Sequence, residues 1–281
     1  AARAAAVIAG GRVNGQVITP ILPLGRFTEA EEYHRDYARR NPAHYAAYRA
    51  GCGRDARLRQ VWRRWPDGRV ECHADLAQHS AFLCNDMVVD GQGRAYVGNF
   101  GFDLDAEIHA RGAESVLGDH PTTVLALVQP DGSVSDAAPG ERFSFPNGMV
   151  ITPDGQTLIV GETLAGRLTA LSIGADGSLS NRREWAPTWP GIPDGIALDA
   201  AGAVWIANPL APECRRIGAG GAVLEVVPTG DLPCYACMLG GPEGKHLFML
   251  VAPSSDATEA AKAPKGKVLV AQVDVARAGL P

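Results

Sequence analysis

The sequence predicts an all-β protein, and more narrowly a β-propeller, from two observations. The first is a repeated pattern in which a short apolar run turns at an Asp- or Gly-rich loop and leaves in a second apolar run; its four copies open at Asn85, Asn147, Asp194 and Ala236. Apolar runs joined by such turns are typical of β-hairpins, because Gly and Asp tolerate the positive φ of tight turns. The second is the spacing of the copies, 62, 47 and 42 residues. Periods of about 40–50 residues with several strands each indicate propeller blades.

Further hairpins alternate with these four copies and bring the expected number of strands to about four per blade. They fall in residues 62–76, 124–132, 168–177 and 222–227. A last strand is predicted over residues 268–273. Residues 102–121 lengthen the first interval, and we expect them to form a loop over one face.

The first part of the chain does not carry the repeat. Thr28 is a good helix N-cap, the residues after it are acidic and then basic, and Pro42 ends the segment, an order that suits the helix dipole. We therefore predict a small helical segment in residues 1–61 and a propeller in residues 62–281.

Composition excludes several classes of protein. A net charge of −5, a pI of about 5.8 and mixed charges argue against nucleic-acid binding. No apolar run approaches the ~20 residues of a membrane span. The pair Cys234 and Cys237 has the spacing of redox and zinc motifs, but no second pair matches it, and we interpret it as two buried thiols. We expect a cytoplasmic location.

The N-terminal segment resembles the C-terminal part of peptide methionine sulfoxide reductase over about residues 1–62. The motifs that carry this resemblance lie in residues 15–21, 27–34 and 52–58. It implies that Glu32 and Tyr37 align with an acid and a tyrosine that help to hold the sulfoxide oxygen. The family's Gly-Cys-Phe-Trp nucleophile motif is absent from this chain. We therefore expect a helical cap or a relic, without reductase activity.

The propeller half resembles the family of senescence marker protein, gluconolactonase and luciferin-regenerating enzyme over about residues 62–281. The motifs that carry this resemblance are Cys84-Asn85-Asp86, residues 98–103, Phe145-Pro146-Asn147-Gly148 and Ile192-Pro193-Asp194-Gly195. The resemblance implies a six-bladed propeller that hydrolyses sugar lactones and related esters with one divalent metal ion at the channel mouth. It implies that Asn147 and Asp194 are metal ligands, and that Asn85 lies close by, against metal-bound water or substrate. We therefore include Asn85 with these two residues in the predicted metal site.

Two departures from the family pattern qualify this prediction. The family's first-blade Glu-Gly-Pro-x-Trp motif, which supplies a third ligand, is absent from this sequence. We expect the affinity for the metal ion to fall steeply unless Glu31, Glu162 or Asp103 replaces that glutamate, and position alone indicates none of the three. About 220 residues of repeat at ~45 each make nearly five blades. We therefore expect an incomplete propeller of the six-bladed type, whose exposed blade edges permit oligomers.

The candidate site combines a carboxylate with amide oxygens, which are hard ligands. Such ligands favour calcium foremost, with magnesium, manganese and zinc as alternatives. We expect Asp194 to orient or deprotonate a water molecule, with Asn85 as the second catalytic residue and a lactone or sugar acid as the ligand. Taken singly, Asn-Gly and Asp-Gly are turn residues. The alternative function is a non-catalytic propeller that binds a small molecule or a protein on its channel face.

Overall fold

The computed structural model describes residues 58–255 and 265–281. The chain divides into two units, Ala1–Arg54 and Asp55–Pro281, and all described residues belong to the second. The helical segment expected over residues 1–61, with Glu31, Glu32 and Tyr37, lies almost wholly outside the described residues and stays a prediction.

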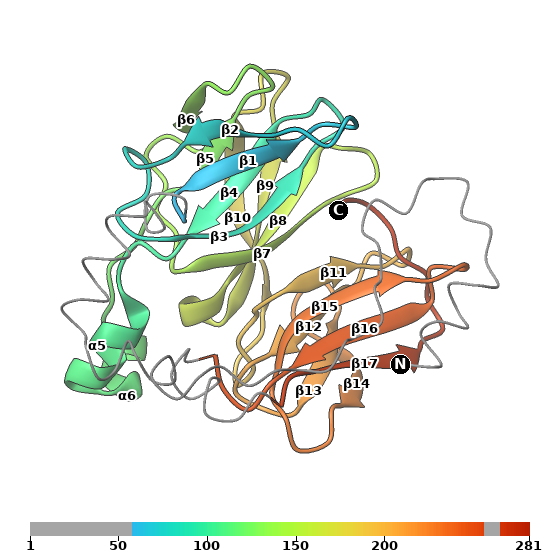
Figure 1. Cartoon of the computed structure of the whole chain (residues 1–281). Helices are drawn as coiled ribbons and strands as arrows, with labels where there is room; N and C mark the ends of the chain where they lie inside the picture. Colours follow the sequence, from blue (N-terminus) through green and yellow to red (C-terminus); the bar gives the residue numbers. More distant parts are fainter. Residues whose placement is uncertain (1–57, 256–264) are drawn as a thin grey trace, which may run out of the picture. The chain divides into compact units, whose positions relative to one another are not determined.

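The described residues form antiparallel sheets in which strands that follow one another in sequence also pair, the arrangement of propeller blades (Figure 1). Three blades have four strands each. They are β3 (Cys84–Val89), β4 (Ala95–Asn99), β5 (Ala126–Val128) and β6 (Val134–Asp136); β7 (Pro146–Ile151), β8 (Thr157–Glu162), β9 (Arg167–Ile173) and β10 (Leu179–Pro187); and β11 (Ile196–Leu198), β12 (Val204–Asn208), β13 (Glu213–Ile217) and β14 (Val223–Pro228).

A fourth blade and a separate hairpin complete the described sheets. The blade has three strands, β15 (Cys234–Gly240), β16 (His246–Val251) and β17 (Lys267–Gln272), and the hairpin pairs β1 (Gln60–Arg64) with β2 (Val70–Asp75). The expected hairpins and the last strand are therefore confirmed. Glycines at positive φ make the turns where the sequence indicated them, for example Gly132 (φ 87°) between β5 and β6.

Each blade buries one apolar face against the next. Tyr96, Met149 and Ile151 share one cluster between the blades β3–β6 and β7–β10. Corresponding clusters lie between the next pairs of blades, and Trp205 is fully buried in the last of them. The β1–β2 hairpin packs in the same way on β3–β6 through Val61 and its neighbours. Burial of a large apolar side chain contributes about 1.5–3 kcal/mol, so this packing between blades stabilises the array.

The array ends on an open apolar face at β15–β17. The face toward β11–β14 is buried, whereas Met238, Leu250, Val268 and Val270 on the opposite face are 39–63% exposed. These four lie on neighbouring strands, because Leu250 pairs with Val268. No described sheet therefore covers this face, in keeping with an incomplete propeller.

The prediction that residues 102–121 form a loop is wrong. The structure places two short helices there, α5 (Leu104–Arg111) and α6 (Ala113–Gly118). Asp103 caps α5 by accepting a hydrogen bond from the backbone N–H of Ala106 at 3.0 Å, and Arg111 pairs with Glu107 one turn earlier. The cap residue and this i,i+4 pair can be read from the sequence, and together they would have predicted the helix α5.

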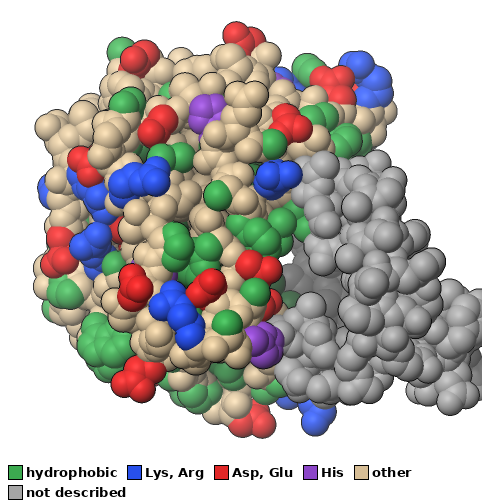
Figure 2. Space-filling view, turned by 90° about the vertical axis from the view of Figure 1, so that its left-hand side faces the viewer, with side chains coloured by type: hydrophobic (Ala, Val, Ile, Leu, Met, Phe, Trp, Pro, Cys, Tyr) green, Lys and Arg blue, Asp and Glu red, His purple; other side chains and the backbone are tan. Residues whose placement is uncertain are grey.

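The surface agrees with the mixed charge of the sequence. Figure 2 shows acidic and basic side chains interspersed on one face. In the described ranges no helix is long and apolar enough to cross a membrane. The cytoplasmic location and the oligomeric state stay predictions.

The buried carboxylate of Glu162 ties β8 to three neighbouring segments. It accepts hydrogen bonds from the backbone N–H of Ser144 (2.8 Å) and the Thr169 hydroxyl (2.5 Å), and ion pairs from Arg167 (3.0 Å) and Arg182 (2.8 Å). Burial by itself raises the pKa of Glu162, but these hydrogen bonds together outweigh it and hold that pKa below its ordinary value of 4.5.

Glu162→Gln is expected to lower the free energy of unfolding at pH 7 by about 2–3 kcal/mol, because the arginines lose a buried partner. A lowered folded-state pKa stabilises the fold above the unfolded pKa, and this contribution disappears as pH falls through the folded value. The difference between wild type and variant in urea unfolding should therefore shrink below pH 4.5. Glu141→Gln, at the 42%-exposed partner of Arg182, should cost under about 1 kcal/mol. A Glu162→Gln difference that is constant with pH would contradict the prediction.

Candidate metal and catalytic site

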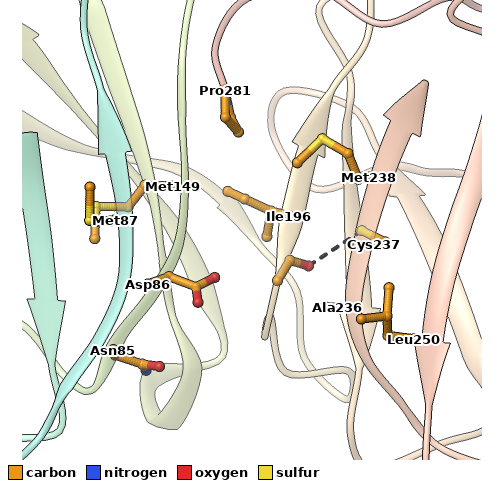
Figure 3. A pocket seen from close by; sticks show the side chains of 11 residues that line it. Asn85, Asp86, Met87, Met149, Ile196, Ala236, Cys237, Met238, Leu250 and Pro281 are labelled. Atoms are coloured by element: carbon orange, nitrogen blue, oxygen red, sulfur yellow. Dashed lines mark hydrogen bonds between the residues drawn. The ribbon is translucent and has the colours of Figure 1, made fainter. Parts of the chain in front are cut away.

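The innermost strands of the four blades, β3, β7, β11 and β15, surround a pocket of about 410 Å³. Figure 3 shows Asn85 at one end of the pocket and Pro281 at the other. The C-terminal tail crosses the second end, where Leu280 bridges to Ile151 and Arg277 to Asp199. The pocket therefore runs along the channel from the start of the inner strands to the C-terminal tail.

A β-bulge in β3 brings two neighbouring side chains to the pocket. Cys84 pairs with Asn99 and Met87 with Val97, so β3 holds one residue more than β4 between these pairs. Side chains normally alternate between the faces of a strand, and a bulge changes this direction locally. Asn85 and Asp86 both line the pocket as a result (Figure 3).

The same irregularity recurs in the next two blades. In β7 the pairs Pro146–Glu162 and Met149–Val160 enclose an extra residue at Asn147-Gly148. Before β11, Asp194 donates its N–H to the Ala207 carbonyl, and Gly195 accepts from the Ala207 N–H, so two residues face one. The three predicted site residues thus occupy equivalent bulges, which are frequent beside active sites.

Glycine follows Asn147 and Asp194 because the next blade lies very close. A Cβ on Gly148 would lie 2.5 Å from the Ile196 nitrogen and 2.6 Å from the Asp194 carbonyl oxygen. The N–H of Gly148 donates to that carbonyl at 3.2 Å, and Gly195 donates to the Tyr235 carbonyl at 3.1 Å. These bonds join the inner strands from blade to blade. In β3 the equivalent position is Asp86, whose side chain enters the pocket instead.

Asn147 and Asp194 lie in direct contact. The Asn147 Nδ2 atom donates to Asp194 Oδ1 at 2.6 Å and to Thr163 Oγ1 at 3.2 Å, and the Thr163 hydroxyl donates to the Pro193 carbonyl at 2.7 Å. Thr163 therefore fixes the amide of Asn147, which is 5% exposed. Among the described residues no donor bonds to Asn147 Oδ1, so this oxygen is free to act as a ligand.

The carboxyl of Asp194 is in an environment that disfavours its charge. Burial, and secondarily repulsion from Asp86, raise the pKa of Asp194 to about 7, against the hydrogen bond from Asn147. Burial also raises the pKa of Asp86. A cation between the two carboxylates would favour their ionised forms, because opposite charge stabilises a carboxylate.

Asn85 bonds to the backbone next to Asn147 and does not itself bond to Asn147 or Asp194 in the described structure. Its Nδ2 atom donates to the carbonyl of Pro146, the residue before Asn147, at 3.5 Å. The structure therefore places Asn85 on β3, Asn147 on β7 and Asp194 just before β11, the inner strands of three successive blades. The fourth repeat, at Ala236, adds no polar side chain but also lines the pocket.

Of the three carboxylates that could replace the missing glutamate, the two in the described part of the chain are bound elsewhere, and the third stays a prediction. Glu162 is held by two arginines, Asp103 caps α5, and Glu31 lies outside the described residues. The carboxylate that does line the pocket is Asp86. The motif that contains Asp86 was visible in the sequence, but its direction depends on the bulge in β3.

The donor set at this end of the pocket fits a hard divalent cation. It consists of carboxylate and amide oxygens, which suit calcium, magnesium or manganese. In the described part of the chain no three His, Cys, Asp or Glu side chains converge closely enough to hold a metal ion by themselves. A cation at this end of the pocket would therefore need amide ligands such as Asn147.

The Cys-x-x-Cys pair belongs to the core. Cys234 and Cys237 are buried on the face of β15 that packs against β11–β14, together with Cys214. Cys237 donates weakly from its thiol to the Gly195 carbonyl at 3.4 Å, and its other side borders the pocket (Figure 3). The interpretation as buried thiols agrees with this packing.

Comparison with known families identifies the propeller half. The family described as "SMP-30/Gluconolactonase/LRE-like region" matches residues 42–253, which is more than half of the chain. The chain belongs to this family. As a member of the SMP-30/gluconolactonase family it carries Asn85, Asn147 and Asp194 inside the matched region.

Solved structures of related propellers have the same fold as this family member. Luciferin-regenerating enzyme superposes with a TM-score of 0.63 at 21% identity, covering 79% of this chain and 75% of that one. Regucalcin from Agrobacterium tumefaciens, a calcium-binding protein, gives 0.60 at 18%, covering 79% and 72%. A gluconolactonase from Xanthomonas campestris gives 0.53 at 23%, covering 80% and 66%. At these identities the likeness shows the fold alone.

Comparison with known families also confirms the resemblance of the N-terminal segment to peptide methionine sulfoxide reductase. Peptide methionine sulfoxide reductase matches residues 2–65. The curated relative from Caulobacter vibrioides, peptide methionine sulfoxide reductase MsrA 2, is 67% identical over 48 residues, 17% of this chain and 24% of that protein. The protein of the same name from Rhizobium meliloti is 36% identical over 61 residues, 22% and 31%. The chain thus spans only about a quarter to a third of the length of these relatives.

Proposed function

We propose that the protein is a gluconolactonase-like hydrolase of lactones or related esters that depends on one divalent metal ion, with calcium the expected ion. The observation that carries the proposal is the contact between Asn147 and Asp194, beside a pocket that is lined by the inner strands of an SMP-30/gluconolactonase propeller. We also propose that the described blades are part of an incomplete propeller of the six-bladed type.

Asn147 and Asp194 would hold the cation, and Asn85 would contact substrate or water. We propose that Asp86 supplies the second carboxylate, in place of the glutamate that the family takes from its first blade. A bound divalent ion supplies polarisation of the substrate carbonyl and stabilises negative charge on its oxygen. The lost glutamate lowers the affinity for the cation, so we expect weaker binding than in a complete site.

Side chains of the protein position the reacting groups and transfer the proton. Thr163 fixes the Asn147 amide, and the Asn147 side chain in turn positions the carboxyl of Asp194. Asp194 accepts a proton from water as that water attacks the carbonyl carbon, and returns it to the leaving oxygen.

The test is hydrolysis of δ-gluconolactone by chelator-treated full-length protein to which calcium, manganese or zinc is added back. We expect chelation to remove the activity and calcium to restore it, with metal binding followed separately by calorimetry. Activity that survives complete metal removal would refute metal dependence. Metal and lactone binding without turnover, in folded protein, would favour the non-catalytic binding function, which the missing glutamate makes the second candidate.

A further inference from the structure

The pocket has a polar end and an apolar interior. Asn85 and Asp86, on β3, are the hydrogen-bonding side chains among its described lining residues, and Asn147 and Asp194 lie beside the same end. Beyond them the walls are apolar. They comprise Met87, Met149, Ile196, Met238 and Leu250, and Pro281 lies at the far end (Figure 3).

Such a pocket is poorly suited to a polyhydroxylated ring. Each hydroxyl that leaves water needs a hydrogen-bond partner, and a site without that partner loses affinity for the hydroxylated ligand. The described side chains beyond Asp86 offer only hydrocarbon and sulfur atoms, and Gly195 adds only backbone groups to the wall. An alkyl group, by contrast, gains affinity with every methylene that it buries.

Three of the wall residues are methionines, on three different inner strands. Met87 lies on β3, Met149 on β7 and Met238 on β15. Unbranched thioether side chains adapt to irregular apolar shapes. The walls can therefore follow a flexible chain and need not match one rigid ring.

We propose that the preferred substrates are lactones or esters with an alkyl chain, bound with the carbonyl at the polar end and the chain along the methionine-lined channel toward Pro281. This proposal rests on the proposed hydrolase function and names its substrate class. The reaction adds water across the acyl C–O bond and yields a hydroxy acid from a lactone, or a carboxylic acid and an alcohol from an ester, so no oxidant or further co-reactant is required.

Three δ-lactones separate the contributions of ring and substituent. δ-Valerolactone has an unsubstituted ring, δ-decalactone adds a pentyl chain, and δ-gluconolactone adds hydroxyls. With calcium-loaded full-length protein we expect kcat/KM for δ-decalactone to exceed that for δ-valerolactone by about tenfold or more, with δ-gluconolactone below both. A preference for δ-gluconolactone over δ-decalactone would overturn the proposal.

A matched pair of variants tests whether the apolar wall causes the preference. Met238→Gln keeps the length of the side chain and makes the wall polar; because Met238 is 39% exposed, this change should be tolerated by the fold. It should lower the decalactone-to-valerolactone ratio by about fivefold. Val268→Thr changes a 63%-exposed residue on the same face of the blade, outside the pocket lining, and should leave the ratio unchanged. Equal effects of the two variants would contradict the assignment.

Binding to inactivated protein distinguishes failure of this inference from failure of the hydrolase function. In Asp194→Asn protein, saturation-transfer NMR should show contact between the pentyl protons of δ-decalactone and the protein, and Met238→Gln added to this variant should weaken it. Such binding together with absent turnover of all three lactones in the wild type would refute the hydrolase but keep the ligand class. Turnover without a preference for the pentyl chain would refute the ligand class alone.

Discussion

Replacing Asp194 with asparagine is expected to lower lactone hydrolysis by about 10²–10⁴-fold, the range for loss of a general base. The substitution keeps the size of the side chain and one oxygen beside Asn147, which donates to Asp194 at 2.6 Å. It removes both the charge that would hold a cation and the group that takes the proton. The measurement is kcat/KM at saturating calcium, with the calcium affinity determined by calorimetry.

The same measurements on Asp86→Asn separate the two carboxylates. Asp86 lines the pocket but has no place in the proton transfer, so its loss should weaken calcium binding by about tenfold and be largely offset by added calcium. The control is Asp274→Asn at an exposed residue beyond the end of β17. Calcium affinity unchanged in Asp86→Asn would contradict its role as second carboxylate. Full activity of Asp194→Asn would refute the proposed mechanism.

Gly148→Ala is expected to lower the free energy of unfolding by about 3 kcal/mol and to reduce activity as well. The added methyl group would lie 2.5–2.6 Å from backbone atoms of residues 194 and 196, which cannot move aside without shifting the next blade. It would also disturb the bond from Gly148 N–H to the Asp194 carbonyl, and so the position of Asp194 beside Asn147. Urea unfolding and kcat/KM on the same preparations measure both effects.

Gly91→Ala is the matched control. Gly91 lies in a hairpin turn at an ordinary φ, and nothing lies within 4 Å of the Cβ that alanine would add. We expect its free energy of unfolding to stay within about 0.5 kcal/mol of wild type. If the two variants were equally stable, the close approach of β7 and β11 would not be important for the fold.

The sequence was sufficient for the fold class because its signals are local. Asp-Gly turns, alternating apolar runs and a period near 45 residues each occur within one blade, so the hairpins and the last strand could be predicted without tertiary information. The helix α5 was missed although its cap, Asp103, is local too. A loop was predicted there although the local sequence favours a helix.

The candidate site was only partly accessible to sequence reasoning. Asn147 and Asp194 were paired from their equivalent places in the repeat, and they lie in contact. Asp86 belongs to the Cys84-Asn85-Asp86 motif, but residues that alternate along an ordinary strand would lie on opposite faces, so the sequence by itself does not place Asp86 beside Asn85 in the site. The bulge that turns both toward the pocket results from pairing between strands, and no residue of β3 by itself signals it.

The sequence alone therefore determined the repeat, the turns and the residue types that open each inner strand, because these depend on backbone propensities within a few neighbouring residues. Only the tertiary structure decided which carboxylate is free. Glu162 is held by arginines and Asp103 by a helix end, whereas Asp86 faces the channel. The apolar interior was likewise decided by tertiary structure, because its walls come from inner strands that follow one another at intervals of 42 to 62 residues and meet only when the blades pack.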